Sequence, residues 1–217
     1  MSVKGGVLSP FLFRKYLADL DEYLSLHCGI VLGHEMDIIC HLLWADDLIL
    51  ASNTVIGMNK LLEGLYEFCS KNLMIINQTK TKMMSFGKVS PHSFLYNGKE
   101  IENVVNYKYL GNIITEGKSI DADIFKNNYD YLKTQSQKAV YAMLKRTSKF
   151  GKLPPNVGLH LFDSLVKPIL LYGSDVWGVS MKGHKIIESC HLTFLRMNLS
   201  IKQSTCKIMI YGDLGRV

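Results

Sequence analysis

The chain has 217 residues, of which 47% are hydrophobic and 20% are charged, a composition typical of a globular protein with a sizeable core rather than a disordered one. No apolar run approaches the roughly 18 residues that span a bilayer and no signal peptide is recognisable, so we expect no membrane partner. The net charge of +6 is uneven, because residues 1–116 carry −2 (10 Lys and Arg, 12 Asp and Glu) and residues 117–217 carry +8 (15 and 7).

The uneven charge and the cysteines indicate the kind of protein. A near-neutral half joined to a basic half suggests a site combined with a polyanion-binding surface, and a merely basic surface explains the charge equally well. The five cysteines are odd in number and include no CxxC pair. This usage favours reduced thiols and an intracellular protein, in the nucleus or the cytoplasm.

The first predicted elements are a helix and a short strand. Ser9 is a suitable N-cap and Pro10 suits the first helical position, and apolar residues then recur at helical spacing to about His27. The apolar residues Ile30–Leu32, between two glycines, predict a short strand. The pair Gly5-Gly6 before this helix would let a ligand or another backbone approach closely, although an ordinary helix start explains it as well.

Two β-like runs, Asp37–Leu43 and Leu48–Ser52, flank Trp44-Ala45-Asp46-Asp47 and predict a β-hairpin. Both runs are apolar on both faces, so we expect the hairpin to be central in a sheet. Burying two adjacent carboxylates there would cost several kcal/mol per ion unless a partner offsets it, and a divalent cation is the usual partner. Asp46 and Asp47 are therefore candidate metal ligands, with an ordinary solvated turn as the alternative.

A second helix is predicted from Thr54 to Lys71, with its core stripe at Met58, Leu61, Leu62, Leu65 and Phe68. Predicted strands at 73–76 and 83–86 flank a polar turn that contains Lys80, which could contact a phosphate or simply be solvated.

Asn97-Gly98 predicts a type I′ hairpin, and strands at 104–109 and 112–115 follow, broken at Gly111. The first half is thus predicted to be α+β, with a largely antiparallel sheet covered by two helices.

The second half, from about Gly117, is predicted to be helical. A long helix over 119–150 carries an apolar stripe on one side and lysines on the other, and Pro154-Pro155 ends it. Further helices are predicted at 157–171, 185–199 and 205–213. Lys138, Lys145 and Lys149 could contact a nucleic-acid backbone, or they could form an ordinary solvated face.

Taken in order, several segments resemble the reverse transcriptases of non-LTR (LINE-like) retrotransposons. GGVLSPFLF (5–13) resembles the start of the family's palm helix, and WADD (44–47) resembles its catalytic (Y/F)ADD box. NLMIIN (72–77) with Lys80 resembles the next palm motif, and YKYLG (107–111) resembles the primer grip. PILLYG (168–173) and GDLGR (212–216) resemble the thumb and the connector that follows it.

The resemblance implies a partial polymerase palm over 1–116 and an all-α thumb with the start of a connector over 117–217. It implies RNA-directed DNA synthesis by two-metal nucleotidyl transfer, with Mg²⁺ or Mn²⁺ as cofactor. The implied partners are an RNA template with a DNA primer, or an RNA–DNA hybrid, and deoxynucleoside triphosphates. The implied site residues are Asp46 and Asp47 as catalytic metal ligands, Gly5 and Gly6 near template or nucleotide, Lys80 near phosphate, Tyr109, Leu110 and Gly111 at the primer end, and Lys138, Lys145 and Lys149 along the backbone.

The sequence also departs from the family pattern. Trp44 replaces the usual Tyr or Phe, and Lys4 stands where a glutamine is usual. The family has the fingers and a further palm strand with another metal-binding aspartate before the segment that begins at Gly5, and only Met1–Lys4 precede it here. We therefore expect a truncated copy with little or no polymerase activity alone. The alternatives are a non-catalytic nucleic-acid-binding fragment or retrotransposon relic, and a palm strand supplied by a second chain.

Overall fold

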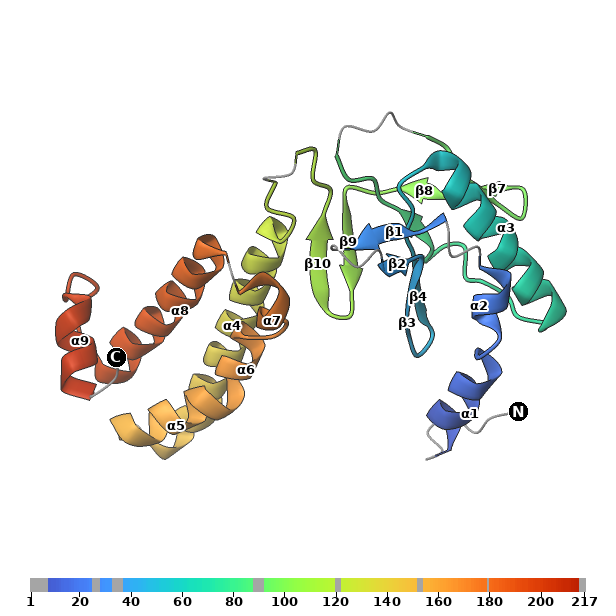
Figure 1. Ribbon diagram of the computed structural model, residues 1–217. Coiled ribbons are helices and arrows are strands. Elements are labelled where there is room, and N and C mark those ends of the chain that lie inside the picture. Colours follow the sequence, from blue (N-terminus) through green and yellow to red (C-terminus); the bar gives the residue numbers. More distant parts are fainter. Residues whose placement is uncertain are drawn as a thin grey trace. The chain divides into compact units, whose positions relative to one another are not determined.

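The computed structural model describes residues 8–24, 28–32, 37–87, 92–119, 122–151, 154–178 and 180–214. The chain forms two compact units (Figure 1). Unit 1 comprises Met1–Ser85 and Val89–Val104, and unit 2 comprises Phe86–Lys88 and Val105–Val217. The units therefore divide before the strand pair at 106–115, which the sequence placed with the first half.

Unit 1 contains three helices and several short strands among its described residues. The helices are α1 (Ser9–Tyr16), α2 (Leu20–Tyr23) and α3 (Val55–Lys71), and the strands are β1 (Ile30–Leu32), β2 (Asp37–Ile39), β3 (His41–Trp44), β4 (Asp47–Leu50), β5 (Lys82–Met83), β6 (Leu95–Tyr96), β7 (Lys99–Glu100) and β8 (Glu102–Asn103). The strands pair two by two, antiparallel in β1–β2, β3–β4 and β6–β7 and parallel in β5–β8. The prediction of largely antiparallel pairing is confirmed, but the described strands form separate two-stranded sheets and not the one sheet that was expected.

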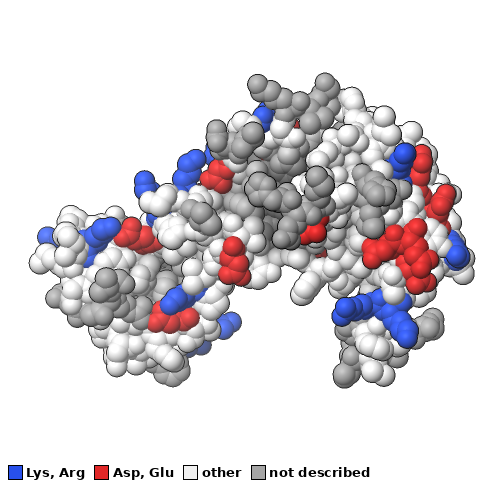
Figure 2. All heavy atoms as spheres, viewed as in Figure 1, with Lys and Arg blue, Asp and Glu red and all other residues white. Residues whose placement is uncertain are grey.

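The first predicted helix is interrupted at Leu17, which leaves two short helices in place of one. Charged residues lie on both sides of the interruption. Arg14 and Lys15 are in the last turn of α1, and Asp21 and Glu22 are in the first turn of α2. Figure 2 shows the basic group over α1 and the acidic group over α2. Each charge has the sign that the dipole of its helix end favours.

Helix α3 confirms the prediction made from Thr54 and the apolar stripe. The Thr54 hydroxyl accepts a hydrogen bond from the Gly57 backbone N–H at 3.0 Å, which caps the helix. All five predicted stripe residues are buried, and together with α2 and β6 residues they form the core of unit 1. The helix therefore supports the β-hairpins of this unit from one side.

The segment 73–76 is not a strand, which corrects the sequence prediction. Leu73 and Ile75 are 92% and 97% exposed, whereas Met74 and Ile76 pack against the core. The Met74 N–H bonds back to the Cys69 carbonyl at 2.8 Å, so the start of the segment closes the end of α3. The alternation of inward and outward side chains is present, but no strand among the described residues pairs with it.

The turn between β6 and β7 confirms the prediction from Asn97-Gly98. Both residues have positive φ, 50° and 72°, as a type I′ turn requires. Leu95 pairs with Glu100 and Tyr96 with Lys99. This local sequence signal was sufficient because the turn depends on backbone dihedral preferences alone.

Unit 2 is a β-hairpin followed by helices. The hairpin is β9 (Asn106–Tyr109) with β10 (Asn112–Thr115), and the helices are α4 (Lys126–Thr147), a 3₁₀ turn (Ser148–Phe150), α5 (Pro155–Leu165), α6 (Lys167–Leu170), α7 (Ser174–Trp177), α8 (Met181–Leu199) and α9 (Lys207–Leu214). Helix α4 begins at Lys126, later than the predicted residue 119.

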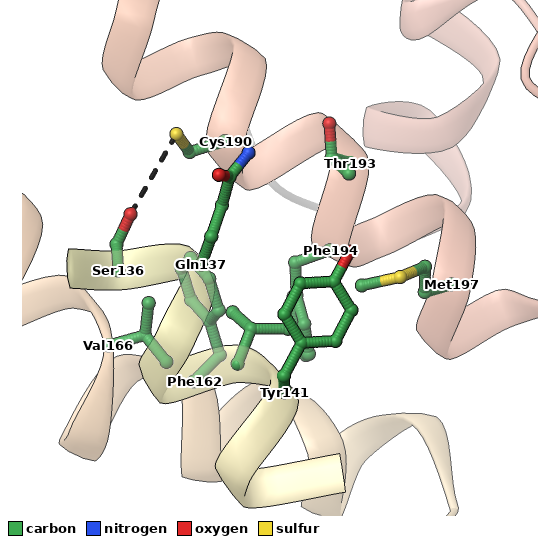
Figure 3. Close-up of a pocket in the computed structure, with 10 residues that line it drawn as sticks. Ser136, Gln137, Tyr141, Phe162, Val166, Cys190, Thr193, Phe194 and Met197 are labelled. Atoms are coloured by element: carbon green, nitrogen blue, oxygen red, sulfur yellow. Dashed lines mark hydrogen bonds between the residues drawn. The ribbon is translucent and has the colours of Figure 1, made fainter. Parts of the chain in front are cut away.

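The main core of unit 2 lies between α4, α5 and α8. Figure 3 shows Phe162, Val166 and Phe194 around a small pocket of about 30 Å³, with the Ser136 hydroxyl directed at the Cys190 thiol. Phe162 and Phe194 are stacked, with ring centroids 4.4 Å apart. The burial of these side chains explains why the three helices pack together.

None of the described helices is long and apolar enough to cross a membrane. All five cysteines are free thiols.

Candidate functional site

The β3–β4 hairpin carries the candidate carboxylates. His41 pairs with Leu50 at its base and Trp44 pairs with Asp47 at its tip, so the connecting loop is Ala45-Asp46. The Ala51 N–H also donates to the Cys40 carbonyl at 2.8 Å and extends the ladder by one step. The turn is thus tighter than predicted, because Trp44 and Asp47 belong to the strands.

The backbone of this turn is strained at Ala45. Its φ is +52°, whereas Asp46 does not have positive φ, so the first loop residue alone is left-handed. Glycine is the usual residue at such a position, and a side chain there costs about 1–3 kcal/mol. The hairpin therefore holds Asp46 and Asp47 on a turn that local preference alone would not choose.

Both carboxylates are exposed, which corrects the expectation that they are buried in an apolar setting. Asp46 and Asp47 are exposed, and the adjacent Trp44 is 67% exposed. The hairpin pairs with no further strand among the described residues, so it is not central in a sheet. The exposed carboxylates therefore do not pay the desolvation cost that was expected from their apolar neighbours. Support for a bound metal has to come from the geometry of the turn.

The base of the hairpin is anchored in unit 1. Leu48 and Leu50 pack against the core, and Cys40, between β2 and β3, is 1% exposed. His41 Nε2 lies 3.4 Å from Asp21 Oδ1 on α2, a contact that is an ion pair when the imidazole is protonated. The hairpin is therefore fixed at its base, while the residues at its tip are exposed.

The two carboxylates suit a divalent cation in kind and accessibility. Neither has a hydrogen-bond or ion-pair partner among the described side chains, so their oxygens are available. Mg²⁺ commonly binds one or two carboxylates and completes its octahedron with water and substrate phosphates. In the described part of the chain, no group of three or more His, Cys, Asp and Glu side chains is arranged to hold a metal. Asp46 and Asp47 can thus supply part of a metal site.

Lys80 lies in a structured turn of unit 1. Asn77 organises this turn: its side-chain oxygen accepts from the Lys80 N–H at 3.2 Å and from the Thr79 hydroxyl at 2.7 Å. The Lys80 side chain is exposed. The neighbouring Lys82 forms an ion pair with Glu102, which ties β5 to β8. Of these two lysines, Lys82 has a structural role, and Lys80 stays the candidate for phosphate contact.

The β9–β10 turn holds the predicted primer-end residues in unit 2. Leu110 and Gly111 form the turn, both with positive φ, and Tyr109 pairs with Asn112. The Tyr172 hydroxyl donates to the Leu110 carbonyl at 2.7 Å. The sequence analysis gave no role to Tyr172, although its position in the PILLYG segment was a signal.

The three lysines predicted to contact a nucleic-acid backbone are exposed. Lys138 and Lys145 lie on α4 and Lys149 lies in the 3₁₀ turn that follows it. None of them forms an ion pair with a described residue. Gly5 and Gly6 lie outside the described residues.

Comparisons with known proteins give two findings. Residues 3–114, slightly more than half of the chain, match the family described as reverse transcriptase (RNA-dependent DNA polymerase). The chain is also similar to an uncharacterized transposon-derived protein of Caenorhabditis elegans, with 28% identity over 168 residues. That alignment covers 75% of this chain and 57% of the relative, so the chain spans little more than half of that protein. No solved structure matches the chain significantly.

Proposed function

Because this chain belongs to the reverse transcriptase family, we propose that it carries part of the machinery for RNA-directed DNA synthesis, with Asp46 and Asp47 as ligands of the catalytic cation. One observation carries this assignment. The two carboxylates lie at the exposed tip of a hairpin that is anchored at its base, and neither has a hydrogen-bond or ion-pair partner among the described side chains. The transposon-derived relative supports a retrotransposon origin, and the WADD and YKYLG segments favour the non-LTR (LINE-like) group.

In this proposal the residues of the chain have distinct tasks. Asp46 and Asp47 hold Mg²⁺ or Mn²⁺, which when bound neutralises phosphate charge and aligns the attacking and leaving oxygens. The anchored base of the β3–β4 hairpin fixes the position of the two carboxylates relative to the core of unit 1. Lys80 contacts a nucleotide phosphate, and the β9–β10 turn contacts the primer end. Residues 1–116 correspond to the palm and 117–217 to the thumb and the start of the connector.

A complete two-metal site requires carboxylates from separate structural elements. Asp46 and Asp47 come from one turn, so one or more further carboxylates must complete the site. We propose that a second chain supplies the further carboxylate or carboxylates. The chain by itself is then weakly active or inactive as a polymerase, and it gains activity only when the site is completed.

A metal-binding experiment tests the assignment independently of activity. Tb³⁺ prefers oxygen ligands, and the indole of Trp44, next to the turn, can sensitise its luminescence. We expect sensitised emission from the intact chain that Mg²⁺ or Mn²⁺ competes away, and a loss of about tenfold or more in affinity for Asp46→Asn and Asp47→Asn, by analogy with the cost of losing outer-shell partners. Asp37→Asn, another exposed strand aspartate, is the matched control and should bind like the wild type. Equal Tb³⁺ binding by all four proteins would refute the proposal.

Primer extension on an RNA template then tests the reaction. With Mn²⁺ or Mg²⁺ we expect weak or undetectable extension by the chain alone. Robust extension by the chain alone would refute the need for a further carboxylate. Extension that survives Asp46→Asn would refute the catalytic role of that residue.

A second function is supported by a specific observation: Lys138 and Lys145 of α4 and Lys149 of the following 3₁₀ turn are exposed and form no ion pair with a described residue. In this alternative the chain binds nucleic acid without catalysis. Each phosphate contact to duplex DNA contributes about 0.9 to the slope of log K against log salt. Replacing Lys138, Lys145 and Lys149 by Gln should lower that slope by about 2–3 units, whereas Lys60→Gln with Lys99→Gln, two exposed lysines of unit 1, should leave it unchanged. Equal slopes for both variants would exclude this surface.

A further inference from the structure

The β9–β10 turn is held in a strained conformation by a tyrosine that is distant in sequence. Leu110 has φ +44°, an uncommon value for a leucine, and Gly111 follows with φ +86°. The Tyr172 hydroxyl donates to the Leu110 carbonyl at 2.7 Å, and a Cβ at Gly111 would lie 2.8 Å from the Tyr172 ring. A left-handed leucine persists only where its surroundings determine the conformation, and here both the two-residue hairpin turn and the contact with Tyr172 favour it.

Tyr172 is itself fixed from behind. It lies between α6 and α7, and its carbonyl accepts a hydrogen bond from the Trp177 indole at 2.9 Å. Trp177 is buried, and it stacks edge-on against Tyr129 of α4 with ring centroids 5.7 Å apart. Tyr172 therefore connects the buried Trp177–Tyr129 pair to the turn of the β9–β10 hairpin.

A second contact fixes the first residues of β10. The fully buried Asn128 of α4 accepts the Ile113 N–H at 2.9 Å and donates to the Asn112 side-chain oxygen at 3.1 Å. Gly173, next to Tyr172, packs so closely on Asn112 that a Cβ would lie 2.4 Å from its amide nitrogen. The hairpin is therefore held at its tip and along one strand by the helices of unit 2.

Burial in the core does not explain why the side chain at position 172 is a tyrosine. Tyr172 is 50% exposed, so its ring contributes less to the core than a buried ring would, while its hydroxyl and ring edge both contact the turn. We propose that Tyr172 is a positioning residue that fixes the Leu110-Gly111 turn so that the turn can contact the end of a nucleic-acid primer. The primer contact rests on the proposed function, whereas the mechanical role of Tyr172 does not.

A double-mutant cycle tests the mechanical role. Gly111→Ala adds both a strained φ and a clash with the Tyr172 ring, whereas Tyr172→Ala removes the partner in that clash and the hydrogen bond to Leu110 but leaves the strained φ. We expect the two changes to be coupled by at least about twofold in the unfolding equilibrium constant. Gly98→Ala is the matched control, because Gly98 also has positive φ in a β-turn and has nothing within 4 Å of its added Cβ. Gly98→Ala and Tyr172→Ala should therefore be additive.

Tyr172→Phe provides a milder test if Gly111→Ala does not fold. Loss of the hydroxyl should speed hydrogen exchange across 106–115, while Tyr66→Phe, at an exposed tyrosine of α3, should not change exchange there. Additivity of Gly111→Ala with Tyr172→Ala, or unchanged exchange in Tyr172→Phe, would overturn the mechanical role.

Binding to two RNA–DNA hybrids tests the functional role. One hybrid has a recessed primer end, and the other is closed at both ends by loops and presents no primer end. We expect the wild type to prefer the recessed end, and Tyr172→Phe to reduce its affinity for that hybrid by about two- to tenfold without changing the affinity for the closed one. A purely structural role would not separate the two ligands.

The outcomes distinguish the two proposals. If the wild type prefers the recessed end and Tyr172→Phe keeps that preference, the positioning role is wrong and the proposed function stands. If the wild type shows no preference for a primer end, the proposed primer contact of the turn is wrong, and the positioning role falls with it.

Discussion

The contact between α2 and α3 leads us to predict that replacing Gly64 by alanine destabilises the protein. Helix propensity alone would give the opposite effect. Gly64 lies inside α3, where replacing a glycine by alanine normally stabilises a protein by about 1 kcal/mol. Here the added Cβ would lie 2.2 Å from the Tyr23 carbonyl oxygen, closer than any real Cβ contact. The backbone of α2 would therefore have to move.

Tyr23 resists that movement because its side chain is also held. Its hydroxyl accepts a hydrogen bond from Lys71, and its ring packs edge-on against the buried Phe68 at 5.4 Å between centroids. Forcing an extra methyl group into a packed contact costs about 1–3 kcal/mol. Because this 2.2 Å contact is with the backbone, the cost lies in the upper part of that range, about 2–3 kcal/mol. Less the gain of about 1 kcal/mol in helix propensity, Gly64→Ala should lower the free energy of unfolding of unit 1 by about 1–2 kcal/mol.

Gly212 of α9 is the matched control. An added Cβ there meets no atom within 4 Å, so Gly212→Ala should raise stability by about 0.5–1 kcal/mol. Urea denaturation followed by circular dichroism measures both changes, each compared with the wild-type transition of its own unit. Gly64→Ala as stable as the wild type or more so would show that α2 moves freely, and would refute the reasoning.

The remaining predictions concern the cap of α3 and the thiols. Thr54→Ala removes the hydroxyl that accepts the N–H of the helix and should destabilise unit 1 by about 1 kcal/mol in the same urea experiment, whereas Thr54→Ser should not. Exposed Cys206 should react with a thiol reagent at pH 8 in the folded protein, and buried Cys69 only after unfolding. Burial raises the pKa of the Cys69 thiol above its usual 9.0, so the folded state retains this proton longer than the unfolded state. Stability should therefore be unaffected by this thiol below about pH 9 and fall as the pH rises further, and a Cys69→Ser variant that falls equally would contradict this cause.

Local signals predicted local structure well. The cap at Thr54 and the stripe behind it gave α3, and Asn97-Gly98 gave the β6–β7 turn, because both depend on neighbours within a few residues. The strand predicted at 73–76 failed although its alternation is present in the structure. A strand also needs a partner, and alternation in one segment carries no information about one.

For the candidate site, too, the local features were predicted correctly and the features that depend on distant segments were not. The sequence placed Asp46 and Asp47 together at a hairpin tip, and the pairing of β3 with β4 agrees. It predicted their burial wrongly, because apolar neighbours along the chain do not reveal whether other elements cover them. The left-handed backbone of Ala45 was also invisible, since alanine gives no signal for positive φ.

The sequence by itself determined the local groupings: the Asp46-Asp47 pair, the lysines spaced for one helix face (Lys138, Lys145 and Lys149) and the turn at Leu110-Gly111. Hydrophobic periodicity, caps and turn chemistry act over a few residues and can be read directly. Only the tertiary structure decided that the carboxylates are exposed and that Tyr172 holds the Leu110 carbonyl. Those properties depend on packing between segments far apart in the chain, where the free energy comes from contacts that no single segment encodes.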